Sequence, residues 1–227
     1  MSGWTIRSNL IRRSEEMPTT IERFERTVQE KAADYGIQPS GEAIAGLSNY
    51  YELLMKWNDR LHLVAPCSPR EFATRHVLES LMLLPYLLLN ARIIDVGSGA
   101  GLPIIPCLIV RGDIRATLIE SSSKKGVFLR EALRVLNCQN QAQVVVEQFQ
   151  DTVTAEADYV TCRALDRFRK LLPTLIEWSP PASTLLLFVG ESLRDEIQAN
   201  IPLAKSERIP NSQRRFLIVA PRGRDVL

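Results

Sequence analysis

The residues best suited to chemistry lie in the stretch 93–103, which reads Ile-Ile-Asp-Val-Gly-Ser-Gly-Ala-Gly-Leu-Pro. The apolar run predicts a strand, and the glycine-rich segment after it predicts a tight turn. The second apolar stretch, which begins with proline, predicts a helix. Glycine lets the strand turn without a Cβ clash and lets the backbone approach a ligand closely. The helix directs its N–H groups and positive end toward the crevice. We therefore predict that this loop binds a cofactor through Gly97, Ser98, Gly99, Gly101 and Leu102.

Two carboxylates accompany the loop and indicate which cofactor it takes. Asp95 precedes the first glycine, and Glu120 ends the next apolar run, 23 residues after Gly97. A carboxylate at that place accepts hydrogen bonds from both ribose hydroxyls of an adenosine-containing cofactor. The dinucleotide pattern Gly-x-Gly-x-x-Gly would need glycine where Leu102 stands, so S-adenosylmethionine fits better than NAD. The alternatives are a dinucleotide oxidoreductase and a purely structural strand-turn-helix with a surface Glu120.

Arg163 follows the fourth apolar run of the second half of the chain. This places it at the carboxyl edge of the predicted sheet, where ligands bind in open α/β folds. We predict that it donates hydrogen bonds to the substrate. The alternative is a structural arginine paired with Asp95, Glu120 or Asp166.

Composition excludes several classes of protein. An apolar content of 45% excludes a disordered chain, and a formal charge of +2 excludes binding to nucleic acid by bulk charge alone. The longest apolar run, Leu81–Leu89, contains a proline and is far shorter than the roughly 20 residues of a membrane span. No signal-like segment opens the chain, so we expect a cytoplasmic protein. We predict no metal site, because the cysteines form no Cys-x-x-Cys pair and only two histidines accompany them.

The elements that position these residues differ between the two parts of the chain. Residues 1–18 show no sustained period and are predicted to form a flexible leader. Apolar residues at steps of three and four then predict helices from a Thr20 cap to near Gly36, from a Ser40 cap to Val64, and after Ser68-Pro69. We therefore predict an all-helical subdomain over 19–90.

From residue 91 onward, short apolar runs alternate with helical stretches, which predicts βαβ units and a mostly parallel sheet. Strands are expected near 92–96, 114–119, 142–147, 158–162, 184–189, 205–209 and 215–220. Helices are expected at 103–110, 124–137, 167–178 and 191–200. Pro173 falls inside the third of these helices, so it either kinks that helix or indicates that the helix has other boundaries. Only about five residues separate the last two strands, so they form an antiparallel hairpin.

The sequence resembles a known family in five places. Three of these places are the loop 95–103, the run 118–130 (Leu-Ile-Glu-Ser-Ser-Ser-Lys-Lys-Gly-Val-Phe-Leu-Arg) and Cys-Arg-Ala at 162–164. The other two, the segments 51–58 and 75–80, lie upstream of the loop. Together they resemble the RsmG family, also called GidB.

The resemblance implies an α/β fold: a Rossmann-like class I methyltransferase sheet of seven strands, the last antiparallel, with an N-terminal helical cap. It implies an S-adenosylmethionine-binding methyltransferase domain over 91–227. The implied activity is methyl transfer from S-adenosylmethionine to guanine N7 of small-subunit (16S) ribosomal RNA, with ribosomal RNA or the small subunit as partner. We further expect a monomer.

The resemblance also extends the predicted site. Ser121 beside Glu120 and the pair Gln148-Phe149 after the third strand join the cofactor residues, and Arg163 and Arg215 match basic positions of the family and are the catalytic candidates. Arg163, Arg167, Arg169 and Lys170 are predicted to hold an RNA backbone if they lie beside the crevice.

The chain departs from the family pattern in three places. Ile104 follows Leu-Pro where the family usually has glycine, Gln148-Phe149-Gln150 replaces Arg-x-Glu, and Val189 replaces a lysine. These departures keep an alternative open: a module that binds S-adenosylmethionine and associates with RNA, with an altered substrate or little turnover. Methylation of cytosine C5 would need a cysteine nucleophile such as Cys162, but the Pro-Cys pairs of this chain lie elsewhere.

Overall fold

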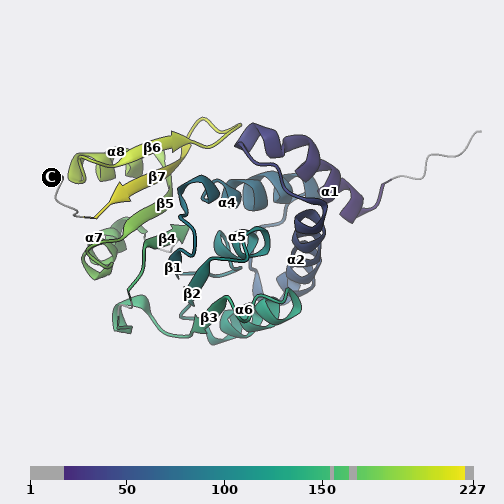
Figure 1. Cartoon of the computed structure of the whole chain (residues 1–227), viewed down its shortest axis with the longest axis horizontal. Coiled ribbons are helices and arrows are strands. Elements are labelled where there is room, and N and C mark those ends of the chain that lie inside the picture. Colours follow the sequence, from purple (N-terminus) through teal and green to yellow (C-terminus); the bar gives the residue numbers. More distant parts are fainter. Residues whose placement is uncertain (1–17, 154–155, 164–167, 223–227) are drawn as a thin grey trace, which may run out of the picture.

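A single seven-stranded sheet forms the centre of the molecule (Figure 1). The computed structural model describes residues 18–153, 156–163 and 168–222. The strand order is β3-β2-β1-β4-β5-β7-β6. All neighbouring strands up to β5 run parallel, while β7 runs antiparallel to both β5 and β6. This confirms the predicted Rossmann-like sheet with one reversed strand and a terminal hairpin.

The strands and the later helices follow the predicted alternation closely. The strands are β1 (Arg92–Val96), β2 (Arg115–Ile119), β3 (Ala142–Val145), β4 (Tyr159–Arg163), β5 (Thr184–Gly190), β6 (Lys205–Arg208) and β7 (Arg215–Pro221). The helices are α5 (Ile104–Val110), α6 (Ser123–Val135), α7 (Phe168–Trp178) and α8 (Glu191–Asn200). Pro173 lies inside α7, so the helix accommodates it instead of ending there.

The first helix, α1 (Thr20–Lys31), begins one residue earlier than its predicted cap allows. Thr19, and not Thr20, is the N-cap: its side chain accepts from the Glu22 N–H, and the Glu22 carboxylate accepts from the Thr19 N–H. This reciprocal pair satisfies two of the free N–H groups at the helix end. The helix tightens into a 3-10 turn at Ala32–Tyr35 and ends at Gly36, whose φ of 70° is left-handed.

Two further helical segments complete the N-terminal part. Helix α2 (Gly41–Leu61) is capped by Ser40 as predicted. The segment 69–81 is continuous but changes its winding, from α3 (Pro69–Phe72) through a π-helical turn (Ala73–Leu78) to α4 (Glu79–Leu81). A capping box at Ser68 and a proline in the first turn start it, as the sequence predicts. Wide π turns occur mainly at functional sites, and this one lies beside the cavity described below.

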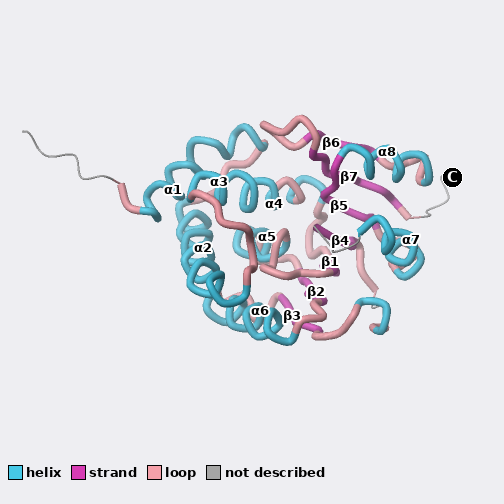
Figure 2. Tube along the Cα trace, turned by 180° about the vertical axis from the view of Figure 1, so that it is seen from behind, coloured by secondary structure: helices cyan, strands magenta, loops and turns pink. Residues whose placement is uncertain are grey.

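Two apolar cores lie on opposite faces of the sheet. Alternate residues of each strand point to opposite faces, and accordingly Ile93 belongs to one core and Ile94 to the other. The first core joins α5 and α6 to the N-terminal helices, and the second lies under α7 and α8. In Figures 1 and 2, the N-terminal helices arch around α5 on the side away from α7 and α8.

The N-terminal helices also contact the glycine loop directly. The Tyr50 hydroxyl of α2, completely buried, donates to the carbonyl of Ala100 at 2.7 Å. The division into a helical subdomain (19–90) and a cofactor domain (91–227) stays a prediction, since these parts share one core. The predicted leader lies outside the described residues except for Pro18.

Across the described ranges, no helix combines the length and apolar character that a membrane crossing requires. The same ranges hold no group of three or more potential metal-binding side chains.

Candidate active site

The glycine loop has the backbone conformation that its residues predict. Gly97, Gly99 and Gly101 have φ values of 71°, 53° and 83°, a region that side chains with a Cβ rarely occupy. A Cβ on Gly101 would lie 2.3 Å from Ile105 Cδ1, so the loop packs against α5 only because this residue is glycine. Pro103 is the N-cap of α5 and not part of its first turn as predicted, since the helix begins at Ile104.

A cavity of about 570 Å³ opens over this loop at the carboxyl end of β1. One side consists of the loop and the end of β2, including Gly97, Ser98, Gly99, Leu102 and Glu120. The other side is contributed by Arg163, by His76 from the π turn and by the connection after α2, residues 63–65. The predicted loop residues and Arg163 therefore line one space.

Glu120 is held in this cavity by backbone donors. Its Oε2 accepts from the Gly99 N–H and its Oε1 from the Ser122 N–H, both at 2.8 Å. The residue is only 7% exposed, so its orientation is fixed. Each oxygen keeps a second lone pair for a further donor.

A smaller cavity of about 180 Å³ adjoins the first and shares Gly97 and Ser121 with it. Gln148 and Phe149, predicted to be cofactor residues, line this second space. The buried Phe149 ring packs edge-on against Trp178 at a centroid distance of 5.4 Å. The two cavities together extend along the carboxyl ends of β1, β2 and β3.

Asp95 lies beneath the loop and lines neither cavity. Its Oδ1 accepts from the Thr161 hydroxyl at 2.7 Å, while its Oδ2 is buried without a partner. Burial raises the pKa of Asp95 to about 7, because the charged form loses its hydration.

These residues fit S-adenosylmethionine. Glu120 offers two lone pairs to a ribose diol, and the cavity with Gln148 and Phe149 accommodates a flat base next to it. Asp95 is completely buried and lines neither cavity, so its predicted contact with the cofactor stays a prediction. Position 102, where the dinucleotide pattern has the glycine that allows close helix–strand packing, carries Leu102, which lines the larger cavity.

Both predicted catalytic arginines bind one buried carboxylate. Arg163 Nη2 lies 3.2 Å from Glu79 Oε2, and Arg215 Nη1 donates to the same oxygen at 2.8 Å. Glu79 is 1% exposed. Among the described residues, Arg163 therefore pairs with Glu79 and not with Asp95 or Glu120, while Asp166 lies outside them.

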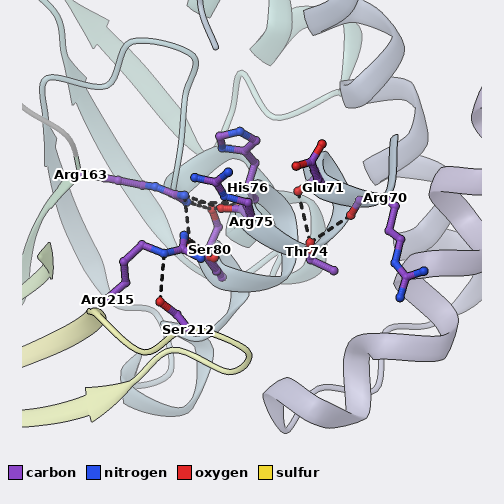
Figure 3. Close-up of polar contacts among 10 residues, drawn as sticks. Arg70, Glu71, Thr74, Arg75, His76, Ser80, Arg163, Ser212 and Arg215 are labelled. Carbon is purple, nitrogen blue, oxygen red and sulfur yellow. Dashed lines mark hydrogen bonds and ion pairs between the residues drawn. The ribbon is translucent and has the colours of Figure 1, made fainter. Parts of the chain in front are cut away.

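The π turn and α4 supply further acceptors to Arg163 (Figure 3). Its guanidinium donates to the Arg75 carbonyl, to the His76 carbonyl at 3.5 Å and to Ser80 Oγ at 3.4 Å. It also lies 5.3 Å from the centre of the Phe188 ring. Arg163 is thus fixed in direction where it lines the cavity, as a positioned donor must be.

His76 faces the same cavity as a neutral imidazole. Burial together with the positive charge of Arg163 lowers its pKa to about 3. Its Nδ1 is buried without a partner, and its ring lies 5.1 Å from that of Phe72.

Sequence reasoning missed Glu79, His76 as a cavity residue, and the segment 63–65. Glu79 and His76 lie in the segment 75–80, whose resemblance to the family was the available signal. The predicted RNA-backbone cluster is only partly described: Arg167 lies outside the described residues, and Arg169 pairs with Glu196 at 3.0 Å.

Residues 43–217 match the family model described as GidB, rRNA small subunit methyltransferase G. This chain belongs to the GidB family. The match covers most of the chain, including the glycine loop, Glu120 and both arginines.

Relatives in the GidB family extend the match. A protein of Xanthomonas campestris pv. campestris (strain B100), named ribosomal RNA small subunit methyltransferase G, is 40% identical over 157 residues, 68% of this chain and 73% of its own. A protein of the same name from Sorangium cellulosum is 33% identical over 174 residues, 74% of this chain and 73% of its own.

Solved structures confirm the class I methyltransferase fold of this GidB member. Mitomycin 7-O-methyltransferase superposes with a TM-score of 0.54 at 15% identity, covering 90% of this chain and 74% of the other. An RNA methyltransferase from Salinibacter ruber, solved with S-adenosyl-L-homocysteine, gives a TM-score of 0.50 at 16% identity, covering 70% and 95%.

Proposed function

We propose that this GidB family member transfers a methyl group from S-adenosylmethionine to N7 of a guanine in small-subunit ribosomal RNA. One observation carries the proposal: the glycine loop, Glu120 and the fixed Arg163 line the same cavity. The family and the names of its members support the substrate class. The cytoplasm and a monomeric state stay predictions.

The residues of this cavity suit a reaction that needs no general base. Guanine N7 carries an in-plane lone pair on a neutral base, so no proton has to leave before it attacks. S-adenosylmethionine supplies an electrophilic methyl group on a sulfonium. The neutral His76 takes up no proton near pH 7, in keeping with such a reaction.

Rate enhancement then comes from position and from exclusion of water. Glu120 and the glycine loop fix the cofactor side, because backbone donors hold the carboxylate. Arg163 faces the same cavity and is proposed to donate to the guanine edge or its phosphate. The segment 63–65 and His76 cover the space from the helical side.

The second candidate is an S-adenosylmethionine-binding, RNA-associated module with little turnover. The observation favouring it is Val189, which is 6% exposed and packs in the second core where the family has a lysine. Gln148 likewise offers an amide, and no cation, to the smaller cavity.

One experiment separates the two candidates. The protein is incubated with methyl-labelled S-adenosylmethionine and small ribosomal subunits from a strain that lacks the modification. We expect label in the RNA at guanine N7, and none with Glu120→Ala or with subunits that already carry the methyl group. A cofactor that raises the melting temperature while no RNA becomes labelled would support the module and overturn the enzyme.

A further inference from the structure

A second, strongly basic cavity lies next to the cofactor cavity. It measures about 360 Å³, and three elements surround it: the end of α1, the segment 69–81 and the β6–β7 hairpin. Both ribbon views bring this hairpin close to the N-terminal helices (Figures 1 and 2). Its charged lining residues are four cations and one carboxylate, namely Lys31, Arg70, Arg75, Arg215 and Glu79. We call it the basic cavity.

The positive charge of the basic cavity is not neutralised by its surroundings. The single carboxylate, Glu79, is shared between Arg215 and the buried Arg163. Lys31 pairs with Asp34 at 3.3 Å. The exposed side chains of Arg70 and Arg75 have no carboxylate within ion-pair distance among the described residues.

The nearest acid along the chain, Glu71, forms no ion pair with them and offsets the charge of Arg75 only through space. Glu71 is engaged by the cap of its own helix, where it accepts from the Ser68 N–H at 2.9 Å and from the Ser68 hydroxyl at 3.0 Å. Burial raises the pKa of Tyr35, so its hydroxyl stays protonated and neutral at the wall of the cavity. The lining therefore carries an excess of about two unpaired guanidinium groups, which attracts an anion.

Two contacts connect this cavity to the site of methyl transfer. Arg163 lines the cofactor cavity, Arg215 lines the basic cavity, and both bind Glu79, which separates them. Arg215 is held from the hairpin side by Ser212, whose hydroxyl accepts from Arg215 Nε at 3.3 Å (Figure 3). An anion in the basic cavity thus lies next to the space for the target base.

We propose that the basic cavity binds a backbone phosphate of the RNA substrate, next to the nucleotide that is methylated. This inference rests on the proposed function. Guanidinium groups present paired N–H donors that match phosphate oxygens. A phosphate contact fixes the register of a nucleic acid without reading its sequence, so the basic cavity positions the strand while the neighbouring cavity receives the guanine.

The test uses the full-length protein and the double variant Arg70→Ala/Arg75→Ala. A matched control, Arg23→Ala/Arg26→Ala, removes the same charge from exposed positions of α1 outside the cavity. Binding to unmodified small subunits is measured at salt concentrations from about 50 to about 200 mM. Binding of S-adenosylmethionine is measured by calorimetry.

We expect the cavity variant to bind small subunits at least about tenfold more weakly. Its plot of log affinity against log salt should be shallower by about one to two units. The control should retain the wild-type slope, and both variants should bind S-adenosylmethionine normally. A cavity variant with the same slope and affinity as the control would overturn the phosphate site.

A separate arm does not depend on the proposed function. Melting temperatures are compared in inorganic phosphate and in chloride at equal ionic strength, and we expect phosphate to protect the wild type and the control more than the cavity variant. Equal protection of all three proteins would overturn the site even if RNA is methylated. Selective protection by inorganic phosphate, with unchanged binding of small subunits, would overturn the assignment to RNA. A wild type that labels no RNA contradicts the proposed function instead.

Discussion

The buried carboxylate of Glu79 gives the sharpest test of how the site is assembled. It is 1% exposed and lies between Arg163, whose side chain is 13% exposed, and Arg215, whose side chain is 34% exposed. Glu79→Ala leaves the Arg163 guanidinium buried without a counter-charge. Breaking a buried ion pair by removing one partner costs about 3–5 kcal/mol, a large share of a typical total stability of about 5–15 kcal/mol.

The assay is thermal unfolding followed by circular dichroism, without cofactor. We expect Glu79→Ala to lower the melting temperature by about 10 °C or more. Glu79→Gln, which keeps the shape and one acceptor, should lose less. The matched control Glu52→Ala removes an exposed carboxylate of α2 and should change little. If Glu79→Ala were no less stable than this control, Glu79 would not be holding the two arginines in place.

Three more predictions follow from the loop and its acids. Glu120→Gln leaves only one accepting oxygen for the ribose and the two backbone donors, so calorimetry should show S-adenosylmethionine binding weakened by about tenfold or more; unchanged affinity would exclude the ribose contact. Burial raises the pKa of Asp95 to about 7, above about 3.9 in the unfolded chain, so the folded protein binds the extra proton between these values. Its free energy of unfolding should therefore fall as pH rises from about 4 to 7, by up to about 1.4 kcal/mol per pH unit; Asp95→Asn should show a flatter profile, and an unchanged profile would contradict the assignment. Gly101→Ala forces a Cβ to within 2.3 Å of Ile105 Cδ1 at a φ of 83°, so denaturant unfolding should show a loss of about 1–3 kcal/mol; a neutral effect would mean that the loop repacks freely.

Local patterns were sufficient to predict the elements and the cofactor loop. The glycines at 97, 99 and 101 require positive φ, and the switch from helical spacing to alternating short runs marks the start of the sheet. Capping at Ser40 and Ser68 was also predicted, because a cap depends on residues within one turn. The two errors were local as well: Thr19, and not Thr20, completes the reciprocal pair with Glu22, and Pro103 precedes α5.

The partners of the charged residues were not predictable in the same way. Arg163 and Glu79 are 84 residues apart in sequence, and Arg215 and Glu79 are 136 apart. Periodicity indicates which face of an element is apolar, but not which element of another segment packs beside it. The sequence therefore suggested nearby or motif acids as partners of Arg163, and Glu79, the buried first residue of α4, was overlooked.

By itself, the sequence determined the order of strands and helices, the turn beneath the cofactor and the placement of Glu120 after the second strand, since backbone conformation and hydrophobic period act over a few residues. Only the tertiary structure decided that the N-terminal helices close one side of that cavity, and that Glu79 joins Arg163 of β4 to Arg215 of β7. The physical reason is that burial of a charge depends on every segment packed around it. A carboxylate on an otherwise ordinary helix becomes the centre of a site only when the folded chain brings those segments together.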